Sequence, residues 1–186
     1  TVGIQRDFKS LTGKTVSVKG GTYGWQIDQE IEAEQLSKDI ASPKDVDREP
    51  IYSKKGYGTY SRLLGDTYVD VDFTKQEVKY YNSGTLKFSC PVVTGCLSKG
   101  HATPTGTYFI INRLRNVVLR GDNGDGSQYE SPVSYWMGIT PTGIGFHDAN
   151  WRSSFGGNIW KTSGSHGCVN MPPSRIPQMF KIVEVG

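Results

Sequence analysis

A regular alternation of polar and apolar residues restricts the fold of this chain more than any other feature of its sequence. The alternation begins over residues 68–73 and resumes over 78–81, after a turn expected near Lys75-Gln76. Because the side chains of a β-strand point alternately to its two faces, the pattern predicts a hairpin with one wet face. The chain after residue 50 is therefore expected to be built mainly from strands.

Later segments continue this pattern between clusters of Gly, Pro, Asn and Asp. Short strands are predicted over residues 86–94, 107–112, 117–120, 133–139 and 143–147. One helix is predicted over residues 174–180, after Pro172-Pro173, and a last short strand over 181–185. The expected fold class is mostly β, with one or two short helices.

The first 48 residues have a different pattern, with a short alternating strand over residues 15–19 followed by a helix. Asp28 is the expected N-cap, and Pro43 enforces an end to the helix. Residues 42–50 are mostly charged residues and prolines, which indicates a linker. We therefore expect a small α+β segment over residues 1–48 and a second domain over 49–186.

The composition argues against nucleic-acid binding and against a membrane-spanning segment. The 21 Lys and Arg residues are scattered and leave a formal net charge of only +3, so no stripe suited to phosphates is visible. No apolar run approaches the roughly 20 residues that a helix needs to cross a bilayer. A hydrophobic content of 35% and a charged content of 21% are typical of a globular protein.

Three cysteines make an odd count, so Cys168 can stand alone while Cys90 and Cys96 either pair or stay free. If residues 89–95 form one strand, Cys90 and Cys96 lie about 20 Å apart, which favours free thiols. Cys168 differs from both in its neighbours, because Ser, His, Gly and Asn are poor residues for the core of a strand.

The residues around Cys168 suit a catalytic nucleophile, in the run Ser165-His166-Gly167-Cys168-Val169-Asn170. A thiol attacks a carbonyl as thiolate, so it needs a nearby base or cation that lowers its pKa, and donors for the oxyanion. His166 lies two positions before Cys168, and His147 ends an apolar strand from which it can project toward a neighbouring strand. Gly167 lets the Gly167 and Cys168 amides approach an oxyanion, and Asn170 can brace the loop. We interpret Cys168 as a nucleophile for acyl transfer that histidine activates.

Other interpretations of these residues are weaker. A lone cysteine is often a small buried hydrophobe, but the polar neighbours of Cys168 argue against that role. One cysteine and two histidines could hold zinc, yet no C-x2-C pair and no fourth ligand is evident. Residues 122–127 hint at a calcium loop, but they lack acidic residues at alternate positions and favour a glycine-rich turn. No metal or other cofactor is expected.

The run around Cys168, with His147 nineteen residues before His166, resembles the catalytic domain of the L,D-transpeptidases of the YkuD type. Residues 91–95 and 103–108 are similar to the family's strand and the TPxG turn that follows it, so the resemblance covers roughly residues 50–186. Residues 18–25 are similar to the end of a peptidoglycan-binding-type domain that precedes this catalytic domain in some Gram-positive members. Residues 1–48 would then be the C-terminal part of such a domain.

The resemblance implies a β-sandwich-like fold and an extracytoplasmic enzyme of cell-wall biogenesis that cross-links peptidoglycan tetrapeptide stems. Cys168 would attack the carbonyl of the third stem residue, a diamino acid, and release the terminal D-alanine. The side-chain amine of another stem would then resolve the thioester and form a 3-3 cross-link. Carbapenem-type β-lactams are implied as inhibitors. The full-length protein is expected to be membrane-anchored, or secreted, through a segment outside this chain.

The resemblance also assigns roles to individual residues. It implies that His147 is the base, that the carbonyl of Asp148 orients its ring, and that His166 and Gly167 support the oxyanion hole. Residues expected to contact the substrate, in the cleft or its lid, are Ser165, Asn170, Trp151, Tyr129 and Trp136.

Two features depart from the family pattern, and two other functions compete with it. Cys90 and Cys96 lie where the family has no requirement, and the chain stops at Gly186, where relatives usually continue into one more strand. A cell-wall L,D-carboxypeptidase or endopeptidase would use the same Cys–His site with water as the acceptor. An inactive wall-binding module would carry these residues as vestiges. A papain-like hydrolase is less consistent, because its cysteine precedes its histidine.

Overall fold

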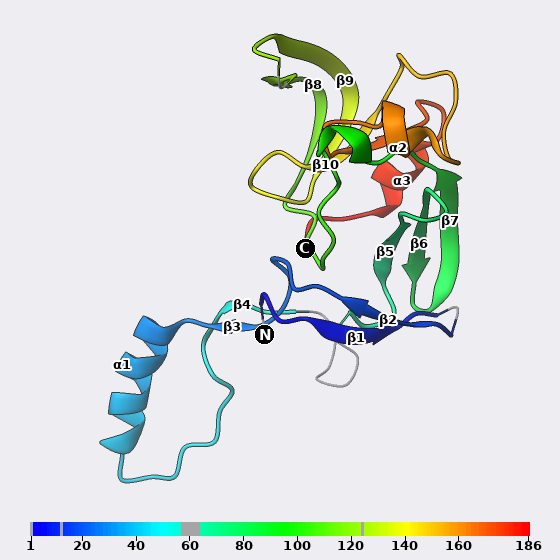
Figure 1. The fold of residues 1–186 in the computed structure, drawn as a ribbon. Helices are drawn as coiled ribbons and strands as arrows, with labels where there is room; N and C mark the ends of the chain where they lie inside the picture. Colours follow the sequence, from blue (N-terminus) through cyan, green and yellow to red (C-terminus); the bar gives the residue numbers. More distant parts are fainter. Residues whose placement is uncertain (1, 12, 57–63, 124) are drawn as a thin grey trace. The chain divides into compact units, whose positions relative to one another are not determined.

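The structure is a computed structural model that describes residues 2–11, 13–56, 64–123 and 125–186 (Figure 1). The chain divides into two compact units, Thr1–Gly65 and Asp66–Gly186. This division lies beyond the boundary expected after residue 48, and the relation of residues 1–48 to a peptidoglycan-binding-type domain stays a prediction. Gly124, in the predicted glycine-rich turn, lies outside the described residues.

The first unit contains two small antiparallel sheets and one helix. The strands pair as β1 (Arg6–Lys9) with β2 (Thr15–Val18), and β3 (Gln26–Ile27) with β4 (Tyr52–Lys54). Helix α1 (Gln29–Ile40) follows Asp28, whose side chain accepts a hydrogen bond from the N–H of Ile31 at 3.3 Å. The predicted N-cap is confirmed, because this carboxylate satisfies an N–H that the helix itself leaves unpaired.

The charged residues that suggested a linker over 42–50 are partly tied back to α1. The guanidinium of Arg48 lies 2.7 Å from Asp39 and 3.0 Å from Glu32, and Glu32 also accepts the N–H of Ile51 at 2.7 Å. Arg48 can serve two carboxylates because its planar group carries five donors. The end of this segment is therefore anchored rather than a free tether.

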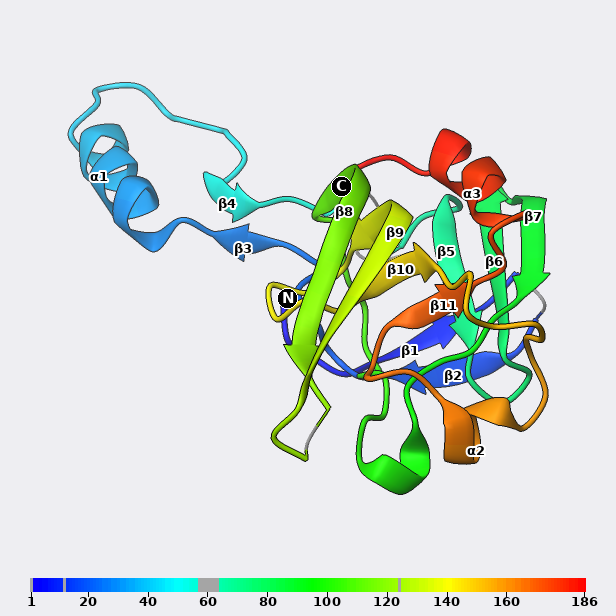
Figure 2. The ribbon, with the colours of Figure 1, turned by 90° about the horizontal axis from the view of Figure 1, so that it is seen from above.

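Two sheets form the second unit (Figure 1 and Figure 2). The first sheet has the order β5 (Tyr68–Asp72), β6 (Glu77–Asn82), β7 (Thr85–Pro91), all antiparallel. The second has the order β11 (Val169–Met171), β10 (Gly145–Asp148), β9 (Gln128–Gly138), β8 (Asn112–Asp122). Only β10 and β11 run parallel within it. The predicted hairpin over residues 68–81 and the mostly β class are confirmed.

Apolar residues from both sheets and from one helix form a single core. Its members include Val78 and Phe88 of the first sheet and Met137 and Phe146 of the second. Ile176, in a helix described below, is completely buried among them. The alternating buried residues of the strands and the buried face of the helix therefore pack into the same core.

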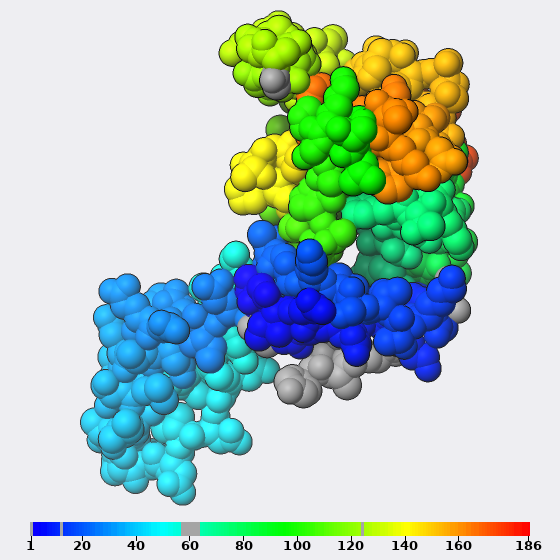
Figure 3. Space-filling model, viewed as in Figure 1, coloured from blue at the N-terminus to red at the C-terminus, as the bar shows by residue number. Residues whose placement is uncertain are grey.

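The helical segments of this unit are short: η1 (Leu97–Lys99), α2 (Ile159–Ser163) and α3 (Ile176–Ile182). η1 contacts α2, and Figure 3 shows the green surface around η1 beside the orange surface of α2. No helix among the described residues is both long and apolar enough to cross a bilayer.

Two predicted strands are absent at the positions expected. Residues 107–111 form no strand, because β9 ends at Gly138 and so offers no partner before Asn112. Residues 183–186 form no strand either, and α3 occupies the beginning of the segment expected to be extended. Ile176, Met179 and Val183 are buried at spacings of three and four, so burial with a helical period determines this segment.

We predict that Ile176→Ala lowers the free energy of unfolding by about 2 to 5 kcal/mol, because it removes a fully buried side chain and leaves a cavity. Ile182→Ala, in the same helix but 38% exposed, should cost less than about 1 kcal/mol. Urea unfolding curves, monitored by tryptophan fluorescence, measure the free energy of unfolding of both variants. Equal losses for the two variants would contradict the position assigned to α3.

Candidate active site

The pairing of β10 with β11 brings Cys168 and His147 to one face of the second sheet. His147 lies opposite Asn170 in this parallel pair, and Phe146 lies opposite Val169. Cys168 precedes β11 and is two positions from Asn170, so its side chain points to the same face as those of Asn170 and His147. Figure 2 shows β10 and β11 side by side. Residues that lie 21 positions apart in the sequence (147 and 168) thereby become neighbours.

His147 is a buried imidazole whose orientation is defined by its surroundings. Its Nδ1 lies 2.9 Å from the carbonyl oxygen of Asp148, the bond expected for these two residues. Because a carbonyl oxygen only accepts, Nδ1 carries the proton and Nε2 keeps its lone pair. The ring lies between Trp136, at a centroid distance of 6.2 Å, and Trp151, at 5.8 Å. Burial lowers the pKa of His147, so the ring is a neutral base at neutral pH.

Asp148 has a second structural role, through its side-chain carboxylate, that the sequence did not indicate. It accepts the backbone N–H groups of Ser134 at 3.1 Å and Tyr135 at 2.8 Å. Asn116 and Ser134 are skipped in the β8–β9 register, and Asn116 has a φ of 54°. The carboxylate thus pairs amides at an irregularity of β9 and holds the end of β10 beside it.

Cys168 is a protonated thiol in this environment, not a preformed thiolate. Burial raises its pKa to about 11, and its Sγ lies 3.5 Å from the carbonyl oxygen of Gly143. A backbone contact with Gly145 opposes this rise. This direction is opposite to the lowered pKa expected of a catalytic cysteine. With both groups neutral, the pair is suited to proton transfer from thiol to His147 during attack, rather than to a resting ion pair.

Ser165 and Gly167 define the loop before the thiol. The hydroxyl of Ser165 accepts the N–H of Gly167 at 3.1 Å and donates to the carbonyl of Cys168. Gly167 has a φ of 121°, a conformation that L side chains rarely adopt. The Gly167 and Cys168 amides were both expected to face an oxyanion, but the N–H of Gly167 is bound to the hydroxyl of Ser165 instead. The N–H of Cys168 has no protein acceptor within the described part of the chain.

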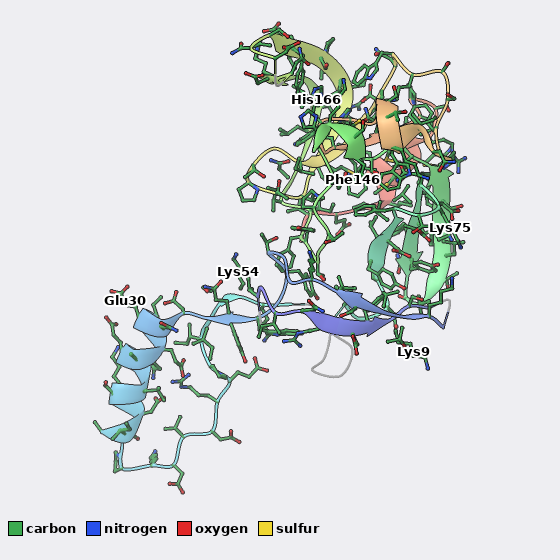
Figure 4. The ribbon with its side chains drawn as sticks, in the orientation of Figure 1. Lys9, Glu30, Lys54, Lys75, Phe146 and His166 are labelled. Carbon is green, nitrogen blue, oxygen red and sulfur yellow. The ribbon has the colours of Figure 1, made fainter. Side chains whose placement is uncertain are left out.

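His166 lies between two rings on the outer side of this loop. Its centroid is 4.8 Å from that of His101 and 4.9 Å from that of Tyr129, which stacks on it. Figure 4 shows His166 between the β8–β9 ribbon and the turn η1. Burial, His101 and Lys99 together lower the pKa of His166, so this ring too favours its neutral form. Sequence reasoning missed His101, for which the only signal was its place just before the TPxG turn.

The remaining predicted residues lie around the same pair. Burial raises the pKa of the Tyr129 phenol, and the charge that Cys168 carries when it is ionised raises this pKa further. Trp136 is buried, whereas Trp151 is 50% exposed and remains open to a substrate. Asn170 exchanges backbone hydrogen bonds with Val93, and its buried Oδ1 has no partner among the described residues. Its side chain is therefore not shown to brace the loop, although its backbone joins β11 to the chain after β7.

The thiols of Cys90 and Cys96 are free, as the sequence favoured. Both are buried, and burial raises the pKa of Cys90 to about 12. Cys90 therefore behaves as a core side chain with little thiolate character.

Known proteins share both the sequence pattern and the fold. Residues 66–186 match the family model of the L,D-transpeptidase catalytic domain, YkuD. The Ldtfm–avibactam carbamoyl enzyme is 39% identical over 98% of this chain and 70% of its own, with a TM-score of 0.82. A cysteine-to-serine mutant of the Enterococcus faecium L,D-transpeptidase is 38% identical over 98% of this chain and 72% of its own, also with a TM-score of 0.82.

A third similar structure contains the catalytic domain alone. The NMR structure of this domain from the E. faecium L,D-transpeptidase, acylated by ertapenem, is 43% identical to this chain. The match covers 64% of this chain and 92% of that domain, with a TM-score of 0.57. No match was found among curated proteins.

We predict that alkylation of Cys168 by iodoacetamide accelerates continuously from pH 7 to pH 10, because its thiol has a pKa of about 11. Peptide mass spectrometry, which quantifies the Cys168 peptide separately from those of Cys90 and Cys96, measures this rate. A plateau beginning near neutral pH would indicate a resting thiolate–imidazolium pair and contradict the neutral pair.

We also predict that His147 titrates below the value of about 6.5 typical of an unfolded chain. The unfolded chain then binds a proton first as the pH falls, so stability is lost from about pH 6.5 down to the pKa of folded His147. NMR titration of the imidazole signals measures this pKa, with His147→Gln used to assign the resonance. A pKa at or above 6.5 would contradict the role assigned to burial.

Proposed function

Because the chain belongs to the L,D-transpeptidase catalytic-domain family, we propose that it is a cysteine acyltransferase that forms 3-3 cross-links between peptidoglycan stems. The observation that carries this proposal is the common face of Cys168 and a neutral, buried His147. Nδ1 of His147 is committed to the carbonyl of Asp148, so the remaining nitrogen is free to act as a base.

The first half-reaction forms an acyl-enzyme. The Sγ of Cys168 attacks the carbonyl carbon of the third residue of a tetrapeptide stem while its proton passes to His147. The N–H of Cys168 is available to stabilise the oxyanion. When the tetrahedral intermediate collapses, the C–N bond breaks and the proton on His147 passes to the departing amine of D-alanine. A thioester and a neutral imidazole remain.

The second half-reaction transfers the acyl group to another stem. The side-chain amine of its third residue attacks the thioester carbonyl, and neutral His147 accepts the proton released by that amine. The C–S bond then breaks, and the sulfur of Cys168 takes the proton back from His147. The enzyme returns to its starting state, so no metal or other cofactor is required by this sequence of steps.

The aromatic residues around the pair are proposed to form the walls of the substrate cleft. Trp151 is half exposed beside His147, and Tyr129 stacks on His166 at the edge of the β8–β9 ribbon. Rings of this kind cover the aliphatic part of a stem peptide and exclude water from the thioester. Trp136, Ser165 and Asn170 are proposed to complete the cleft.

The proposed site of action is the cell wall, outside the cytoplasm, where tetrapeptide stems serve as donor and acceptor. Carbapenem-type β-lactams are proposed inhibitors, because their strained amide presents a carbonyl to Cys168 as an acyl donor does. The ertapenem-acylated relative supports this part of the proposal.

We predict that incubation with a carbapenem adds one adduct mass to the unmodified protein and none to Cys168→Ala, because the proposed thioester forms on the Cys168 thiol. Intact-protein mass spectrometry measures the adduct. Cys90→Ala is the matched control and should still be acylated, since Cys90 is a core thiol with a pKa of about 12. An adduct on Cys168→Ala would disprove the assignment of the nucleophile.

The same proteins distinguish transfer from hydrolysis when incubated with a disaccharide-tetrapeptide. Cross-linked dimer that disappears in Cys168→Ala supports the transpeptidase. Tripeptide without dimer would identify the L,D-carboxypeptidase instead, and a folded protein with neither product would identify a wall-binding module.

A further inference from the structure

A buried hydroxyl outside the predicted site contacts the loop that carries the nucleophile. Thr103 lies in the segment after η1 and is 7% exposed. Its Oγ1 accepts the N–H of Gly95 at 2.9 Å and donates to the carbonyl oxygen of Gly167 at 2.7 Å. The second of these groups belongs to the peptide bond that joins Gly167 to Cys168.

The chemistry of the two partners fixes the direction of both hydrogen bonds. An amide N–H only donates and a carbonyl oxygen only accepts, so the single hydroxyl proton of Thr103 must point to Gly167. Both hydrogen bonds are buried, so water cannot readily replace either of them. Thr103 therefore holds the carbonyl of Gly167 in one direction.

Holding this carbonyl also directs the amide of the nucleophile. In a planar trans peptide the C=O and the following N–H point in opposite directions, so a fixed Gly167 carbonyl fixes the N–H of Cys168. Gly167, at a φ of 121°, has no side chain that would stop this plane from rotating. Ser165 holds the N–H of Gly167 and the carbonyl of Cys168, on the two sides of the same peptide. The N–H of Cys168 has no protein acceptor among the described residues.

The segment that carries Thr103 is itself held at close range. A Cβ added to Gly95 would lie 1.8 Å from the carbonyl oxygen of His101 and 2.7 Å from the N of Thr103, so only glycine allows this approach. Gly95 also bridges to Ser165 in the parallel sense. The backbone of Gly95 therefore holds both the hydroxyl of Thr103 and Ser165, where the Cys168 loop begins.

We propose that Thr103 is a positioning residue for acyl transfer, whose hydroxyl holds the Gly167–Cys168 peptide so that the N–H of Cys168 faces the developing oxyanion. This inference rests on the proposed acylation of Cys168, but it does not depend on which acyl donor the protein uses. Thr103 acts through the peptide and has no contact with the reacting atoms. Its loss should slow the formation of an oxyanion without changing the nucleophilicity of the thiol.

Two reagents separate these effects at the same sulfur atom. With p-nitrophenyl acetate, the Sγ–C bond forms through a tetrahedral oxyanion, the bond between the acyl carbon and the phenolic oxygen breaks, p-nitrophenolate leaves and the thiol proton passes to His147. Iodoacetamide is instead displaced at a saturated carbon, with iodide leaving and no oxyanion formed. Acylation is followed by the absorbance of p-nitrophenolate and alkylation by mass spectrometry. Cys168→Ala provides the blank for both.

Thr103→Val keeps the shape of the side chain and removes the hydroxyl. We expect its acylation rate to fall about 10- to 100-fold, somewhat less than the effect of deleting an oxyanion donor outright. Its alkylation rate should stay within about threefold of the unmodified protein, because the thiol and His147 are unchanged. Thr103→Ser, which keeps the hydroxyl, should restore acylation. Thr105→Val, an exposed threonine in the same turn, is the matched control and should change neither rate.

If Thr103→Val fails to fold, Thr103→Ala compared with Thr103→Ser provides a second pair that differs only in the hydroxyl. Equal losses of acylation and alkylation in the hydroxyl-free variants would assign Thr103 a merely structural role and overturn the proposal. An unmodified protein that is alkylated but not acylated would overturn it as well. Absence of peptidoglycan cross-linking, with normal ester acylation, would count only against the proposed function.

Discussion

The parallel pairing of β10 with β11 is the constraint on which the rest of the active site depends. It places His147 opposite Asn170 and brings Cys168 to the same face, although 21 positions separate the two catalytic candidates. A parallel pair cannot be closed by a tight turn, so the chain between the strands must make a long crossover. That crossover contains α2 and ends in the Ser165–Cys168 loop, whose geometry is then set by groups from other segments. The loop of the proposed nucleophile, Cys168, is therefore held by neighbours that are remote in sequence.

Desolvation determines the electrostatic character of this pair. Burial raises the pKa of Cys168 and lowers that of His147, so both effects favour the uncharged forms. The bond from Nδ1 to the carbonyl of Asp148 leaves the other ring nitrogen as the acceptor for a proton. In the proposed mechanism, activation of the thiol is therefore coupled to attack, and a protonated thiol at rest is less exposed to oxidation than a thiolate. The rings of Trp136 and Trp151 lie beside His147.

Much of the fold could be predicted where local patterns and tertiary packing agree. The hairpin over residues 68–81 and the Asp28 cap of α1 depend on short-range periodicity and on one side chain, so their sequence signals were sufficient. Two strand predictions failed because the structure of those segments depends on contacts with other parts of the chain. Residues 107–111 lack a partner strand, and residues 181–182 belong to a helix whose buried face continues to Val183. Apolar composition alone did not distinguish these cases, since a short apolar run suits either element.

The sequence by itself determined the chemical parts of the site: a cysteine among polar residues, two histidines at a family-specific spacing and a glycine before the nucleophile. The φ of 121° at Gly167, which L side chains rarely adopt, is a finding of the structure. Only the tertiary structure decided how these parts interact. It brought His101 and Tyr129 to His166, and it buried Cys168 so that the pKa of its thiol is raised rather than lowered as expected. It also placed the hydroxyl of Thr103 on the Gly167–Cys168 peptide. The reason is physical: desolvation, ring stacking and the direction of a hydrogen bond depend on groups that meet only after the strands have paired and excluded water.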